Sequence, residues 1–112
     1  MLTCTSHGGG TFTTSFLPKG GQIKPHTDGT LYDPVTATPT THSVIIYINS
    51  NESNGGATEF SSQPSPEWRH AFEKLDEVKP EAGKALIFQH QLPHQGAVVE
   101  DGTKIILRMD MY

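Results

Sequence analysis

The sequence predicts a mainly all-β fold, a jelly roll of seven or eight short strands with one short helix. Its 112 residues include 11 Gly and 8 Pro, a composition that favours short strands and frequent turns over long helices. Residues 66–75 (PEWRHAFEKL) are the one stretch with apolar residues at helical spacing. We favour a jelly roll because a closed double sheet leaves few strand edges exposed.

The order of strands and turns supports a single domain over residues 11–112, preceded by a flexible lead-in over residues 1–10 that ends in three glycines. Residues 43–49 (SVIIYIN) are apolar on both faces, which is typical of a buried strand. Residues 29–41 carry Gly, Asp-Pro and Thr-Pro without periodicity and are predicted to be a loop. Further strands are predicted over residues 11–17, 22–28, 57–61, 78–80, 84–89, from the last histidine to residue 99, and 103–112.

Charge and composition exclude several classes of function. The net charge is -4 without a basic run, so binding to nucleic acid through phosphate contacts has no support. No apolar run approaches the roughly 20 residues of a membrane span, and the first residues lack the features of a secretory signal. Cys4 is the only cysteine, which excludes an internal disulfide and favours a reducing, cytoplasmic location.

The sequence contains a candidate metal site of the 2-His-1-carboxylate type. His26 and Asp28 are two residues apart, so an extended strand places both side chains on one face. His90 and His94 are both candidates for the third ligand, and we favour His94 because Gly96 lets the backbone approach closely. Such a triad holds Fe(II) and leaves positions open for substrate and dioxygen. His7, His42 and His70 have no such partner and are expected to be structural or exposed.

A cation on the last predicted strand suggests an anionic ligand. Lys104, Ile106 and Arg108 share one face of this strand, and a charge that points into a barrel must be paired. A cosubstrate that bears a carboxylate would pair it, whereas two solvated charges on an edge strand are the alternative. Tyr47 is predicted to be buried and to need a partner for its hydroxyl.

Taken together, these features resemble the 2-oxoglutarate- and Fe(II)-dependent dioxygenases, in particular the prolyl-4-hydroxylase-like branch. The similarity is carried, in the order of the family, by GGQIKPHTD, SVIIYIN, GGATEF, VKPEAGKALIFQH and HQGAVVEDGTKIILRMDMY. The resemblance implies a double-stranded β-helix in which His26, Asp28 and His94 hold the iron. It also implies that Lys104 holds the distal carboxylate of 2-oxoglutarate, with Tyr47 and Arg108 as further cosubstrate residues.

The resemblance further implies hydroxylation of a prolyl residue in a protein or peptide, or of a related amino acid, with ascorbate as an additional cofactor. Asp28 argues against the halogenating relatives, which leave that position open. Residues 29–41 and 61–65 are expected to line the substrate groove. The alternatives are a cupin-like metal-binding module without oxygenase activity and a truncated, inactive interaction domain.

The sequence departs from the family in two ways. Phe16 and Leu17 stand where many relatives have a tyrosine, so one cosubstrate contact is expected to be missing. The helices that pack on the larger sheet in relatives are also absent, which would leave an apolar face uncovered. We expect a second subunit or an N-terminal segment to cover this face. A stable monomer in size-exclusion chromatography that binds no hydrophobic dye would refute this expectation.

Overall fold

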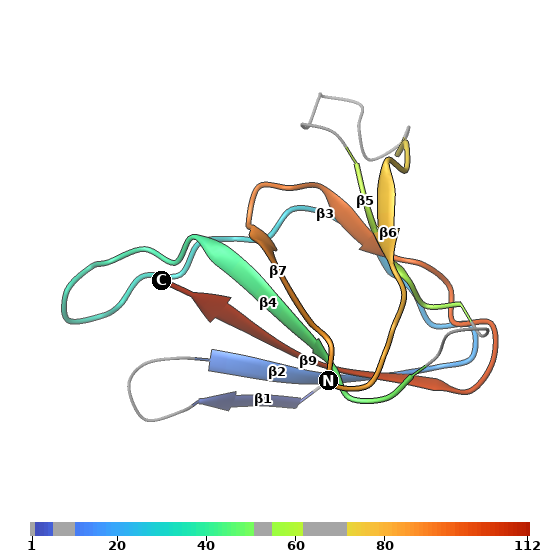
Figure 1. Ribbon diagram of the computed structural model, residues 1–112. Helices are drawn as coiled ribbons and strands as arrows, with labels where there is room; N and C mark the ends of the chain where they lie inside the picture. Colours follow the sequence, from blue (N-terminus) through green and yellow to red (C-terminus); the bar gives the residue numbers. More distant parts are fainter. Residues whose placement is uncertain (1, 6–10, 51–54, 62–71) are drawn as a thin grey trace.

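The computed structural model describes residues 2–5, 11–50, 55–61 and 72–112, and within them it has two antiparallel sheets (Figure 1). The larger sheet has the strand order β1-β2-β9-β4-β7, and the smaller one has the order β3-β8-β5-β6. The strands are β1 (Leu2–Thr5), β2 (Thr11–Pro18), β3 (Ile23–His26), β4 (His42–Tyr47), β5 (Thr58–Phe60), β6 (Asp76–Val78), β7 (Ala85–Gln89), β8 (His94–Gly96) and β9 (Thr103–Met111).

Strands that are distant in sequence are neighbours in both sheets. The last strand, β9, lies between β2 and β4, and β8 lies between β3 and β5. In the smaller sheet this pairing sets His26 opposite His94, so two residues far apart in the sequence meet across one ladder. The topology therefore builds the candidate site.

The core lies between the two sheets, where their inward-facing residues meet. Alternate residues of a strand point to opposite faces, so one half of each strand contributes to this layer. The buried cluster comprises Ile45, Tyr47, Phe60, Phe88 and Ile106. Two facing antiparallel sheets around one core confirm the predicted jelly roll.

Two segments differ from the sequence-based expectation or lie outside the described residues. Residues 2–5 form β1 rather than a flexible lead-in, because they pair with β2, whose edge offers free backbone groups. Residues 66–71 of the expected helix lie outside the described residues, and residues 72–75 have no regular secondary structure. Among the described residues, no helix has the length and apolar character needed to cross a membrane.

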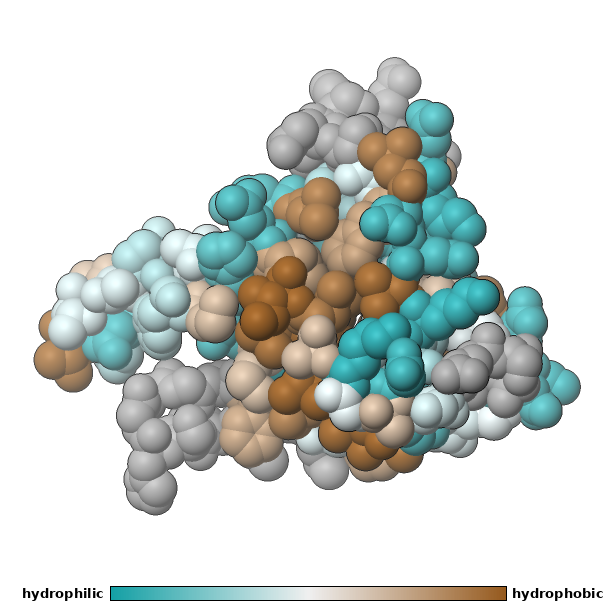
Figure 2. Space-filling view, in the orientation of Figure 1, coloured by the Kyte–Doolittle hydropathy of each residue, from teal (hydrophilic) through white to brown (hydrophobic). Residues whose placement is uncertain are grey.

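The face of the larger sheet that points away from the core is rich in apolar side chains. Cross-strand partners share a face, and the register pairs Phe16 with Ile105, Ile46 with Leu107, and Val44 with both Ile87 and Met109. Phe16 and Ile87 are each 55% exposed. Hydrophobic residues also gather near the middle of the view in Figure 2, where β4 and β7 lie in Figure 1. We call the sheet face that carries these cross-strand partners the outer face. It comprises Phe16, Val44, Ile46, Ile87, Ile105, Leu107 and Met109.

Candidate functional site

Three side chains from the smaller sheet and the loop after β3 converge on one point. The ligand atoms of His26, Asp28 and His94 all lie within 4.8 Å of one another. Nε2 of His26 is 3.3 Å from Oδ1 of Asp28, and Nε2 of His94 is 3.5 Å from Oδ2. The Asp28 backbone N–H donates to the carbonyl of His90 at 2.9 Å, which fixes the chain beside the two imidazoles. Two nitrogens and a carboxylate at this spacing form a set that could hold a metal ion.

Hydrogen bonds to backbone carbonyls orient both imidazole rings. Nδ1 of His26 lies 2.7 Å from the carbonyl of Lys24, and Nδ1 of His94 lies 2.8 Å from that of Leu92. A carbonyl only accepts, so each Nδ1 carries a proton and each ring turns its Nε2 toward Asp28. This arrangement is typical of histidine ligands, whose second nitrogen is held by a neighbouring acceptor.

Aromatic side chains also hold the His94 ring. Phe88 packs edge-on against it with ring centroids 4.7 Å apart, and the Phe60 ring lies 6.2 Å away. Both phenylalanines belong to the buried core. The position of this imidazole is therefore set by the packing of the two sheets.

The surroundings favour the protonation state of a metal ligand at Asp28 and His94 but not at His26. Burial alone would raise the pKa of Asp28, but hydrogen bonds from His26 and Ser43 and the charges of His94 and Arg108 bring it below its usual range. Burial lowers the pKa of His94, so the ring is neutral at neutral pH. The hydrogen bond with Asp28 raises the pKa of His26. A metal ion would have to displace any proton that His26 shares with the carboxylate.

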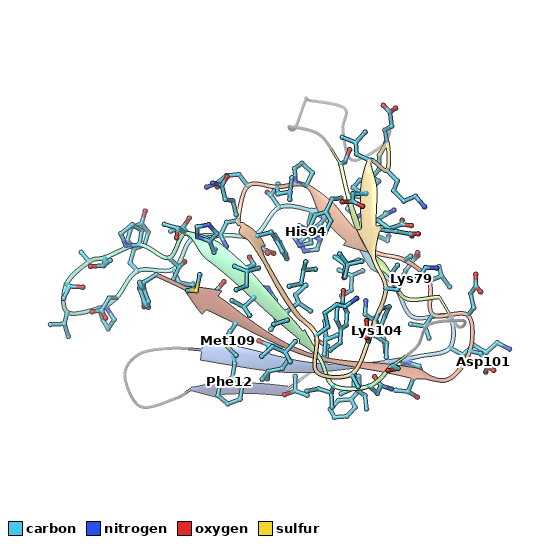
Figure 3. All side chains as sticks on the ribbon, in the orientation of Figure 1. Phe12, Lys79, His94, Asp101, Lys104 and Met109 are labelled. Carbon is cyan, nitrogen blue, oxygen red and sulfur yellow. The ribbon has the colours of Figure 1, made fainter. Side chains whose placement is uncertain are left out.

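The three groups open onto a cavity of about 530 Å³ between the two sheets. Its wall includes Lys104 and Arg108 from β9 together with apolar side chains such as Ile45 and Ile106. In Figure 3, His94 and Lys104 both lie in the space between the sheets, one from each sheet. The cavity therefore has a possible metal site and a buried cation on its walls.

Lys104 is buried without a partner. Its residue exposure is 2%, and no other residue in the described part of the chain gives its ammonium an ion pair or a hydrogen bond. Burial lowers the pKa of Lys104 to about 8. A buried unpaired charge is costly, so the geometry favours an anionic group in the cavity as its partner.

The structure places the other predicted cosubstrate residues differently. Arg108 reaches the cavity wall, but its Nη2 already contacts Oδ2 of Asp28 at 3.3 Å and Oδ1 of Asp110 at 3.1 Å. Tyr47 is fully buried, and its hydroxyl lies 2.5 Å from Oγ1 of Thr58, a residue that lines the cavity. Any influence of Tyr47 on a ligand would pass through Thr58, so its direct role stays a prediction.

The structure adds three hydroxyl residues to the surroundings of the site, Ser43, Thr40 and Thr58, and it shows where His90 lies. His90, the other candidate for the third ligand, is fully buried outside the triad and bonds to Ser43 and Thr40. No pattern in the sequence indicates a role for these two hydroxyls or for Thr58 in the GGATEF stretch. Serine and threonine are too common for a pattern to single them out, and only the fold shows that they meet the site. Leu17 lines the cavity, whereas the Phe16 side chain lies on the outer face, so neither residue brings a hydroxyl to the cavity.

Comparison with known proteins gives a family and a fold. The family model of the 2OG-Fe(II) oxygenase superfamily matches residues 12–109. No curated protein is significantly similar to the chain in sequence. A prolyl-4-hydroxylase from Pseudomonas putida has a TM-score of 0.66 at 17% identity, over 92% of this chain and 52% of that one. A viral collagen prolyl hydroxylase from Paramecium bursaria Chlorella virus-1, solved with 2OG, has a TM-score of 0.60 at 19% identity, over 92% and 60%.

Cupins share the same architecture. A cupin domain from Bordetella pertussis has a TM-score of 0.61 at 11% identity, over 99% of this chain and 90% of its own. At such identities the structural likeness establishes the double-stranded β-helix and nothing finer. The chain spans only 52% and 60% of the two hydroxylases.

Proposed function

The chain belongs to the 2OG-Fe(II) oxygenase superfamily, and we propose that it is an Fe(II)- and 2-oxoglutarate-dependent dioxygenase that hydroxylates a prolyl residue or a related amino acid. One observation carries this proposal. The His26, Asp28 and His94 cluster and the unpaired ammonium of Lys104 face the same cavity. A metal site alone has no need for a buried cation, whereas a dicarboxylate cosubstrate needs both.

In this proposal each residue has a defined task. The Nε2 atoms of His26 and His94 and the Asp28 carboxylate hold the iron, and Lys104 binds the distal carboxylate of 2-oxoglutarate. Bound iron supplies the dioxygen chemistry, in which 2-oxoglutarate is decarboxylated to succinate while a C–H bond of the substrate is hydroxylated. The protein binds and orients the reactants, and the apolar wall of the cavity limits access of water. Arg108 and Tyr47 as cosubstrate residues, and ascorbate as a reductant, belong to this proposal.

The substrate class is inferred from similarity and from the loop beside the site. Two of the similar structures are prolyl hydroxylases by name, which supports a peptide or protein substrate. Leu31, Tyr32 and Val35, in the loop between β3 and β4, have 46%, 65% and 91% of their surface exposed. Exposed apolar side chains on a loop that also contributes Gly29 to the cavity wall are suited to contact a peptide. The outer face is proposed to meet a second subunit or a further segment, and a cytoplasmic location stays a prediction.

A metal-binding module without oxygenase activity is the second candidate. The likeness to a cupin domain over 90% of that domain's length favours it, because the hydroxylases extend well beyond the aligned region. An interaction domain without metal is the third. Neither of these two candidates explains why the Lys104 side chain is buried in the cavity wall.

An anaerobic titration of the purified protein with Fe(II) and then 2-oxoglutarate tests the proposal. We expect a weak visible charge-transfer band once both have bound, and its decay with formation of succinate when oxygen is admitted. His42→Gln is a matched control, since His42 is outside the cluster and its Nδ1 bonds only to the neighbouring Thr41 hydroxyl. Iron binding without the band would favour the metal module, and no iron binding would favour the interaction domain.

A further inference from the structure

A continuous chain of hydrogen bonds connects Asp28 to the loop between β3 and β4. The Ser43 hydroxyl donates to Oδ2 of Asp28 at 2.5 Å, and Nδ1 of His90 lies 2.8 Å from the same hydroxyl oxygen. On the other side of the ring, Nε2 of His90 lies 2.8 Å from Oγ1 of Thr40. The Leu31 backbone N–H donates to that oxygen at 3.0 Å. Four hydrogen bonds thus join the proposed ligand to a residue of the loop.

The middle of this chain is sealed from solvent. His90 and Ser43 are 0% exposed and Thr40 is 3% exposed. Buried polar groups that water cannot reach must be satisfied by the protein, and an unsatisfied one costs about 1–3 kcal/mol. The backbone holds the same region, because the His90 N–H donates to the carbonyl of Thr41 and the His90 carbonyl accepts from the N–H of Asp28. The ring therefore has one position and two fixed neighbours.

Asp28 sets the direction of the two hydrogen bonds on its side of His90, and a neutral ring then sets the direction of the bond to Thr40. An ionised Asp28 only accepts, so Ser43 uses its proton there and must accept from Nδ1–H of His90. At the other end the Leu31 N–H donates to the Thr40 oxygen, and the Thr40 hydroxyl can donate a hydrogen bond to a lone pair on Nε2. A neutral His90 with its proton on Nδ1 satisfies all four bonds. Asp110 is 3.9 Å from Nε2, beyond hydrogen-bond distance.

We propose that His90 is a positioning residue that, as the neutral Nδ1–H tautomer, orients the Asp28 carboxylate through Ser43. Ser43 and Arg108 both contact Oδ2, and these two contacts fix the orientation of the carboxylate. The chain of bonds also ties the setting of this carboxylate to the loop at Leu31. This inference rests on the proposed metal site but not on the oxygenase reaction.

The tautomer is tested in the metal-free protein. Long-range ¹H–¹⁵N correlation spectra at pH 8 report which ring nitrogen of each histidine carries the proton, and Ser43→Ala identifies the His90 signals by their shift. We expect a proton on Nδ1 and a bare Nε2 at His90. A proton on Nε2, or on both nitrogens, would overturn the proposed relay.

Positioning is tested by Co(II) titration, which measures metal affinity and the ligand-field spectrum without turnover. We expect His90→Leu and Ser43→Ala to lose about 10- to 100-fold in Co(II) affinity and to change the ligand-field spectrum. Losses of this size are usual when a residue that holds a metal ligand by hydrogen bonds is replaced. His90→Asn, whose amide can still donate to Ser43, should recover most of both. His42→Leu is the control and should match the wild type.

The outcomes separate this inference from the proposed function. Variants at His90 and Ser43 that unfold at lower temperature but bind Co(II) with unchanged affinity and spectrum would reduce His90 to a structural role and overturn the inference alone. Ser43→Ala deletes only a hydroxyl, so it keeps the test valid if His90→Leu does not fold. A wild-type protein that binds no Co(II) would overturn the metal site, and the positioning role with it.

Discussion

Replacing Lys104 with methionine should weaken the binding of 2-oxoglutarate by about 30-fold or more and leave metal binding unchanged. Lys104 is 2% exposed as a residue and lines the cavity without an ion-pair partner in the described part of the chain. Removing one partner of a buried charge pair costs roughly 2–5 kcal/mol, which corresponds to a factor between about 30 and several thousand. Calorimetry of 2-oxoglutarate binding to the Mn(II)-loaded protein without oxygen measures the affinity with no turnover.

The same substitution should have the opposite effect on stability. Lowering the pKa of Lys104 from 10.5 to about 8 corresponds to a cost on the order of 3 kcal/mol for the buried charge, and methionine fills similar space without it. The metal-free variant should therefore unfold at a higher denaturant concentration than the wild type. Lys79→Met at an exposed position is the matched control. Equal affinity for 2-oxoglutarate in both variants would remove the cosubstrate role of Lys104.

The pH dependence gives an independent check on this residue. Below pH 8 Lys104 carries its charge in the free protein, and above it the ammonium loses its proton. Cosubstrate affinity should therefore fall as the pH rises through about 8. Lys104→Arg stays charged over this range, so its affinity should fall less. Parallel profiles in the two proteins would assign the pH effect to the metal site.

The sequence predicted the parts of this fold whose signals are local or specific in spacing. Residues 43–49 stand out as a buried strand, and the structure has β4 there as a central strand between β9 and β7. The pair His26 and Asp28 is recognisable from its spacing, and the structure brings His94 to it, although β3 ends at His26 and Asp28 lies in the loop after the strand rather than on it. The face shared by Lys104, Ile106 and Arg108 also lines the cavity. Each of these inferences needed only a local pattern and an unusual residue in it.

What the sequence could not predict depends on long-range contacts. The role of His90 follows from hydroxyls 47 and 50 residues away in sequence, Ser43 and Thr40, which no period connects to it. The contact of the Tyr47 hydroxyl with Thr58 across the core is of the same kind, and the cosubstrate role of Tyr47 stays a prediction. The pairing of residues 2–5 with β2 depends on a free strand edge rather than on their own composition. Partners of this kind become visible only when the register is known.

Removing any one group of the triad should abolish the stabilisation of the protein by metal. A metal at 100 times its dissociation constant adds about 2.7 kcal/mol to the free energy of unfolding, which a thermal melt detects as a higher midpoint. We expect this rise in the wild type and none in His26→Ala, Asp28→Ala or His94→Ala. Asp33→Asn is the control, because Asp33 is on the loop outside the cluster and bonds to the backbone of Val35 and Thr36. A wild-type rise that persists in His26→Ala would contradict the triad.

The three variants should differ from one another when no metal is present, and this difference tests how the site is built. Asp28 makes the most contacts of the three groups. Its side chain is 5% exposed, and its carboxylate contacts Ser43, Arg108 and both imidazoles. Its removal leaves the buried Ser43 hydroxyl without its acceptor and takes one of two carboxylates from Arg108, so Asp28→Ala should lose about 3 kcal/mol of stability. The His26 side chain is 34% exposed, and His26→Ala should lose much less. Equal losses in the metal-free proteins would mean that the carboxylate is not held as the structure places it, because a solvated Asp28 would leave nothing unpaired behind.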